Sequence, residues 1–296
     1  MLAILGGLGA ALCWATSSMA SARASRAIGA WATLGWVMLI GTAMSIPATL
    51  LWGGGANLTG EALILLAISG AANVVGLLLA YAAFQRGQVA VVASILATEG
   101  ATAAVISIAF GEQVAIGALI VLAALAVGVV LASSGGQDDG VAAEPGGLAA
   151  DPHQPRTDAA VLPIALAAVA CFGINLYATG RLGATLPLVW SILPARLGGA
   201  VFVALPLLAT RRLTLVRPAV PFVVIVAVAE VVGMAVYAYG ARDGIAVAAV
   251  TSSQFGAIAA VVSVVAFGER LRRRQVVGVA LIALGVAALA AVRATA

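Results

Sequence analysis

The chain has almost none of the side chains from which metal sites and disulfides are built. Its 296 residues include one histidine, His153, and two cysteines, Cys13 and Cys171. Both cysteines lie inside apolar runs, where a small buried side chain is commoner than a disulfide or a metal ligand. His153 lies in a polar linker, apart from any apolar run. We therefore expect no metal site and no cofactor.

Charge is equally scarce. Only 9% of the residues are charged, against about a quarter in a typical soluble domain. Hydrophobic residues make up 63% of the chain, and the mean hydropathy is +1.15. Lysine is absent, so all 15 basic residues are arginine, and the net charge of +4 does not argue for nucleic-acid binding. The composition indicates a membrane protein.

The apolar residues gather in segments about as long as a bilayer is thick. A helix rises 1.5 Å per residue, so roughly 20 residues cross the hydrocarbon core. The segments are 2–22, 31–52, 62–84, 89–110, 113–133, 160–180, 188–209, 219–240, 245–267 and 275–292. Most connections between them are short, which makes consecutive helices antiparallel neighbours. The first segment follows Met1 without a basic leader or a clear cleavage site, so we expect it to be retained.

One polar stretch divides the segments into five and five. Residues 134–159 are rich in Gly, Pro and acids, which is typical of a flexible linker. The two sides carry matching motifs, because Phe110-Gly111-Glu112 recurs 157 residues later as Phe267-Gly268-Glu269. Further matches near this offset pair Gly76 with Gly233, Gly87 with Gly244, Gly128 with Gly285, and Cys13-Trp14 with Cys171-Phe172. We predict repeats at 1–133 and 160–296.

An odd number of helices in each repeat has a topological consequence. Two related halves of five helices, placed in sequence, must cross the membrane in opposite senses. The predicted fold is therefore an all-α polytopic membrane protein with ten transmembrane helices in a 5+5 inverted repeat. Transporters built this way bind their solute near the midplane between the halves.

Three charged side chains lie within predicted membrane segments. Glu99 lies at the centre of 89–110, Glu230 at the centre of 219–240, and Arg196 close to the centre of 188–209. Each would cost roughly 2.5–3.5 kcal/mol at the bilayer centre on insertion scales. The cheapest arrangement turns all three toward one cavity, with Arg196 paired to a carboxylate. The other carboxylate could then carry a proton, and we favour Glu230 slightly over Glu99 for this role. The alternative is that these groups only fix helix packing.

Other polar and aromatic side chains lie at similar depths. Substrate-binding candidates are Asn73, Trp14, Tyr81, Asn175, Tyr237 and Gln254. Hydrogen bonding between helices is the alternative role for such residues. Glu112 and Glu269 close apolar runs, and we expect both to end helices at water.

The ten segments, the duplication and the repeat-closing Gly111-Glu112 and Gly268-Glu269 resemble the EamA-like family of the drug/metabolite transporter superfamily. The resemblance implies transport of small metabolites such as amino acids or sugars through a central cavity between the halves. It also implies that Arg196 matches the arginine in the seventh helix of that family. Family members are usually drawn with both termini in the cytoplasm.

The predicted function is a secondary transporter that moves a small organic metabolite, an amino acid or related compound, across a prokaryotic plasma membrane. We favour export, and broad-specificity drug efflux is the alternative. The expected partners are the solute, the lipid bilayer and protons as a candidate coupling ion, for a monomer or homodimer. A membrane enzyme is disfavoured because the sequence has no nucleotide-binding loop and no nucleophile–base pair. A non-catalytic membrane scaffold remains the weaker alternative.

The arginines predict an orientation opposite to the usual family drawing. Cytoplasmic loops collect basic residues. One side of the predicted bundle holds Arg23, Arg26, Arg86, Arg156, Arg211, Arg212, Arg217, Arg270, Arg272, Arg273 and Arg274, and the other holds Arg181, Arg242 and Arg293. We follow this count, which places both termini outside.

Overall fold

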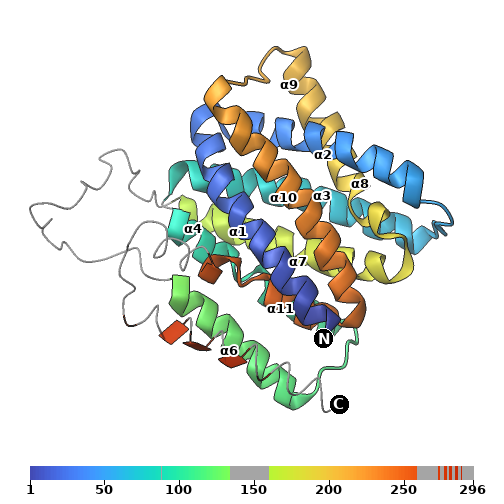
Figure 1. The fold of residues 1–296 in the computed structure, drawn as a ribbon, viewed down its shortest axis with the longest axis vertical. Helices are drawn as coiled ribbons and strands as arrows, with labels where there is room; N and C mark the ends of the chain where they lie inside the picture. The colour runs from blue at the N-terminus through green and yellow to red at the C-terminus, as the bar shows by residue number, and fades with distance from the viewer. Residues whose placement is uncertain are drawn as a thin grey trace, which may run out of the picture.

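The protein is all-helical over the residues that the computed structural model describes, which are 1–87, 89–133, 160–258 and separate positions from 273 to 288. The predicted linker 134–159, the motif Phe267-Gly268-Glu269 and most of the last predicted segment lie outside them. The helices form one bundle (Figure 1). Six of them are long and apolar enough to cross a membrane: Leu2–Ile28, Ala30–Trp52, Gly60–Arg86, Val161–Thr185, Leu188–Ala209 and Arg217–Asp243. The prediction of a membrane protein with these six segments is confirmed.

The first half begins with three long helices, α1 (Leu2–Ile28), α2 (Ala30–Trp52) and α3 (Gly60–Arg86). Only Gly29 separates α1 from α2, and its φ of 84° is a conformation that glycine adopts without strain. Thr59 caps α3 by accepting a hydrogen bond from the Ala62 amide at 3.2 Å. Three shorter helices follow, α4 (Val89–Leu96), α5 (Glu99–Ala109) and α6 (Ile116–Ser133).

The second half begins with α7 (Val161–Thr185), which is followed by a segment of mixed helical geometry. This segment comprises η1 (Leu188–Ser191), α8 (Leu193–Gly199), the π-helical turn η2 (Ala200–Ala204) and α9 (Leu205–Ala209). Prolines at 194 and 206 lack the amide hydrogens of regular helix, which accounts for the interruptions. The turn η3 (Arg217–Ala219), α10 (Val220–Gly240), η4 (Ala241–Asp243) and α11 (Ile245–Ser252) follow.

The prediction of one continuous helix over 89–110 is wrong. The helix is broken by a turn at Ala97 and Thr98, so Glu99 is the first residue of α5 rather than the middle of a span. The predicted span 245–267 is broken too, because α11 ends at Ser252 and helix resumes at Phe255. Neither break contains a proline or a run of charges, so the pattern of apolar residues did not reveal them.

The two broken helices cross at their breaks. The Gly100 amide donates a hydrogen bond to Ser253 Oγ at 2.8 Å. A Cβ added at Gly100 would lie 2.0 Å from that oxygen and 2.2 Å from the Ala249 carbonyl oxygen. Gly100 therefore allows the N-terminus of α5 to touch the backbone of α11 in the interior of the bundle.

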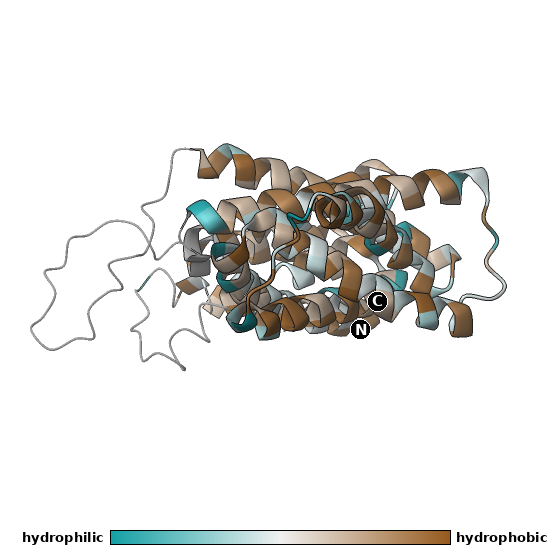
Figure 2. Cartoon of the chain, turned by 90° about the horizontal axis from the view of Figure 1, so that it is seen from above, coloured by the Kyte–Doolittle hydropathy of each residue, from teal (hydrophilic) through white to brown (hydrophobic). Residues whose placement is uncertain are grey.

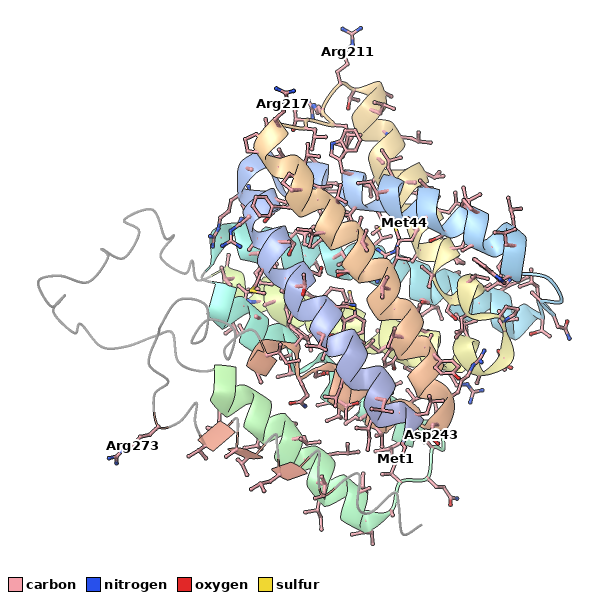
Figure 3. The ribbon with its side chains drawn as sticks, in the orientation of Figure 1. Met1, Met44, Arg211, Arg217, Asp243 and Arg273 are labelled. Atoms are coloured by element: carbon pink, nitrogen blue, oxygen red, sulfur yellow. The ribbon has the colours of Figure 1, made fainter. Side chains whose placement is uncertain are left out.

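Antiparallel helix pairs connect the two halves. In Figure 1, α1 runs beside α10, and α3 and α7 lie behind them. Arg181 near the end of α7 forms an ion pair with Glu61 at the start of α3, with 3.2 Å between nitrogen and oxygen. Figure 3 shows Met1 and Asp243 together at one end of α10, and Arg211 and Arg217 near its other end.

The outer surface of the bundle is apolar. Figure 2 shows hydrophobic residues along most of the length of the helices. Large side chains such as Leu50 and Phe202 are about four-fifths exposed, at 81% and 80%. In water such a surface would be unfavourable, and in a bilayer it faces lipid tails. The charged side chains Glu99, Arg196 and Glu230 are instead buried between helices.

Candidate functional site

A narrow cavity of about 50 Å³ lies between the two halves of the bundle. In this conformation it is smaller than the roughly 300–1,000 Å³ of typical small-molecule sites. Helices α1, α3, α4, α5, α7 and α10 contribute to its wall, as does the helical turn after α11. Its lining residues are Trp14, Ser17, Ser18, Ser21, Asn73, Leu77, Ala80, Tyr81, Phe84, Leu96, Glu99, Phe172, Asn175, Leu176, Glu230, Met234 and Phe255.

Glu230 of α10 lines this cavity and has two partners. The Ser17 hydroxyl of α1 donates a hydrogen bond of 2.7 Å to its Oε1. Its Oε2 lies 3.6 Å from Nη2 of Arg196, which is an ion pair too long to be a hydrogen bond. Both groups are buried, so the pair neutralises charge inside the bundle.

Arg196 of α8 does not itself line the cavity. It is 1% exposed, and its side chain lies where α8 packs against α2 and α10. Gly41 of α2 leaves room for it, because a Cβ there would come within 2.8 Å of Arg196 Cδ. Its Nη1 contacts the Met38 sulfur at 3.9 Å, while Nε and Nη2 have no hydrogen-bond partner among the residues described. Arg196 therefore serves as the counter-ion of Glu230 from behind the cavity wall.

Glu99 lines the same cavity without any such partner. The side chain is 6% exposed and forms no hydrogen bond or ion pair with any described part of the chain. As the first residue of α5, it lies where unpaired backbone N–H groups and the helix dipole favour a negative charge. The broken helix therefore holds a carboxylate at the cavity, available to a solute or a proton.

Polar groups of α3 and α7 also line the cavity. Asn73 and Tyr81 of α3 are almost fully buried, and neither the Asn73 Oδ1 nor the Tyr81 hydroxyl has a hydrogen-bond partner among described residues. Asn175 of α7 accepts hydrogen bonds from Ser69 at 2.9 Å and Thr179 at 3.3 Å. Asn73 and Tyr81 therefore keep unused hydrogen-bonding capacity beside the cavity, whereas the Asn175 oxygen already has partners.

Tyr237 and Gln254 lie outside the cavity lining. The Tyr237 hydroxyl donates a 2.9 Å hydrogen bond to the Leu176 carbonyl oxygen, which ties α10 to α7. Its ring packs against Trp14, with 6.0 Å between centroids. Gln254 Nε2 donates to the Val250 carbonyl oxygen at 2.9 Å. The structure thus brings six of the nine candidates, Trp14 among them, to the cavity, and leaves Arg196, Tyr237 and Gln254 behind its wall.

Several lining residues were not among the candidates chosen from the sequence. Ser18 and Ser21 continue the face of α1 that begins with Trp14, and their helical spacing was a usable signal. Phe84, Phe172 and Phe255 also line the cavity. An isolated phenylalanine in an apolar run carries no such signal.

Glu112 contacts the second half of the protein at the start of α11. Its carboxylate oxygens accept hydrogen bonds from the Ala246 amide at 3.1 and 3.3 Å, and Ser107 donates to the same group. Gly244 is the N-cap of α11 and has no side chain that could accept a hydrogen bond from the Ala246 amide. Glu112 therefore caps α11 from the first half, beyond the expected role of ending a helix at water.

Comparison with known proteins finds a family match for the first half of the chain. The model of the EamA-like transporter family matches residues 1–134. No curated protein matches the chain. A solved structure described as "Crystal structure of protein" is 20% identical, with a TM-score of 0.70 over 97% of this chain and 95% of that one. Similarity at that identity shows the fold alone.

Proposed function

We propose that this chain, whose residues 1–134 match the model of the EamA-like transporter family, is a secondary transporter of a small organic metabolite. The family consists of membrane transporters rather than enzymes. We place the chain in the plasma membrane of a prokaryote and propose export of an amino acid or a related compound. The observation that carries the proposal is the cavity between the halves, which contains two buried carboxylates.

The proposed mechanism is alternating access between two inverted repeats, 1–133 and 160–296, joined by the linker 134–159. Matching contacts support this division. A Cβ on Gly233 of α10 would lie within 3.0 Å of Cys13 and Trp14 in α1. The equivalent Gly76 of α3 faces Cys171-Phe172 of α7 in the same way. The α1–α10 interface thus corresponds to the α7–α3 interface, with the first-half helix of one pair replaced by the second-half helix of the other. Ten helices in a 5+5 inverted repeat require such a correspondence.

Glu99 is the better candidate for coupling to protons, in place of Glu230. Glu230 already has Arg196 and Ser17 as partners, whereas Glu99 has none among the described residues. A lone buried carboxylate is most easily neutralised by a proton or by a solute cation. Exchange of a proton for a solute cation at Glu99 would link solute movement to a proton gradient.

Counterflow in proteoliposomes tests the proposal. Vesicles that contain the purified full chain are loaded with an unlabelled solute and diluted into its labelled form, using pools of amino acids, amines, sugars and nucleosides. We expect transient accumulation of at least one label. Vesicles that contain a Glu99→Gln variant should lose the dependence of that flux on a pH gradient, and vesicles with Glu61→Gln, altered at an exposed glutamate, should keep it. Absence of counterflow for every pool would favour the scaffold alternative.

Broad-specificity drug efflux is the second candidate. Met234 and the aromatic rings of the cavity wall favour it, because a flexible thioether and flat rings can adapt to different apolar solutes. Competition experiments separate the two candidates. A metabolite carrier should be inhibited by close analogues of one solute, and a drug carrier by chemically unrelated compounds.

A further inference from the structure

The charges on the cavity wall are all of one sign. Glu99 and Glu230 are lining residues, and no Arg or His of the described chain lines the cavity. Arg196 balances Glu230 at 3.6 Å from behind the wall. Glu99, when ionised, therefore has no counter-charge among the described residues, and only the contents of the cavity can supply one.

The remainder of the wall suits a cation with an apolar body. Five aromatic residues line the cavity: Trp14, Tyr81, Phe84, Phe172 and Phe255. The faces of aromatic rings attract cations and also bury apolar groups. The unpartnered oxygen of Asn73, which is 1% exposed, can accept a hydrogen bond from an ammonium group.

We propose that the cavity binds a small organic monocation, a protonated amine on an aromatic or aliphatic body. The ammonium group binds the Glu99 carboxylate, and the body packs among the aromatic rings. This inference rests on the proposed transport function, and it narrows the solute from amino acids and related compounds to amines without a carboxylate. A carboxylate on the solute would be repelled by Glu99 and Glu230, and no basic side chain on the described wall could form an ion pair with it.

A set of four matched solutes tests the class. 2-Phenylethylamine carries only the positive charge, L-phenylalanine adds a carboxylate, 3-phenylpropanoate carries only the negative charge, and 2-phenylethanol is neutral. Equilibrium binding of each is measured by calorimetry on the full-length protein in lipid nanodiscs at neutral pH. We expect the amine to bind at least tenfold more tightly than each of the other three.

Substitutions locate the binding charge. Glu99→Gln keeps the size of the side chain and removes its charge, so it should weaken binding of 2-phenylethylamine at least tenfold and leave binding of 2-phenylethanol unchanged. Glu61→Gln makes the same chemical change at an exposed position, 72% exposed, and should change neither. The comparison of amine with alcohol on the wild-type protein decides the charge preference even if the Glu99 variant does not fold.

Each outcome distinguishes the solute class from the transport function. Equal or tighter binding of phenylalanine or of the alcohol overturns the inference, as does the absence of binding by all four solutes. An amine whose affinity is unaffected by Glu99→Gln overturns the role of Glu99. Binding of the amine without counterflow would contradict transport but keep the ligand class. Counterflow of other solutes, without amine binding, would keep transport and reject the class.

Discussion

Removal of one member of the Arg196–Glu230 pair should destabilise the protein by several kcal/mol. The charged atoms lie 3.6 Å apart, and the two side chains are 1% and 9% exposed. At this distance Coulomb's law with an effective dielectric constant of roughly 20 gives an attraction of about 4.6 kcal/mol. Loss of one partner leaves the other buried and unpaired, which costs roughly 3–5 kcal/mol. We expect this loss for Arg196→Met and for Glu230→Gln.

The assay is a double-mutant cycle on the free energy of unfolding, measured by denaturant titration in detergent micelles. The double variant should be less destabilised than the sum of the single variants, with a coupling of about 2–3 kcal/mol. Arg181 and Glu61 provide a matched control in the same chain. Their 3.2 Å pair is 46% and 72% exposed, so the cycle of Arg181→Met with Glu61→Gln should give less than about 1 kcal/mol.

A coupling at Arg196–Glu230 no larger than that at the exposed pair would refute this reasoning. So would an Arg196→Met variant with wild-type expression and stability, because Glu230 would then have found a partner elsewhere.

Three further predictions concern the crossing of the halves and their orientation. Gly100→Val should prevent wild-type packing of α5 on α11, and the expected readout is loss of monodisperse protein in size-exclusion chromatography. Glu112→Ala should lower the free energy of unfolding by about 1 kcal/mol, the usual value of a helix cap, and Glu112→Gln should lower it by less. Equal stability of the wild-type protein and both variants would show that Glu112 does not cap α11. A reporter fused after Ala296 should report an outside C-terminus, as the arginine count indicates, and a cytoplasmic signal would show that the count misleads.

The sequence predicted the six long spans better than it predicted the breaks inside helices. Length and hydropathy were sufficient for the six long spans, because a bilayer demands about 20 apolar residues whatever their neighbours. The break before Glu99 was missed because it lies in a run of small and β-branched residues without proline. Thr98-Glu99-Gly100 was the available signal, since a hydroxyl residue followed by an acid is typical of a helix start.

The different environments of Glu99 and Glu230 could not be predicted from the sequence. Both are single acids in apolar runs, and from the sequence we slightly favoured Glu230 as the proton carrier. What separates them is tertiary structure: Ser17, 213 residues away, and Arg196 both reach Glu230, while no described residue pairs with Glu99. Such contacts depend on how helices distant in sequence pack together.

Covalent obstruction of the cavity tests most directly the claim that the solute passes through it. Ser18 lines the cavity, and its side chain forms no hydrogen bond with any described residue. In a protein with both native cysteines replaced by alanine, Ser18→Cys is labelled with a bulky maleimide and assayed for counterflow, with the exposed Thr214→Cys as the control. We predict that labelling at position 18 abolishes counterflow and that labelling at position 214 leaves it intact. Full counterflow in protein labelled at position 18 would contradict the account.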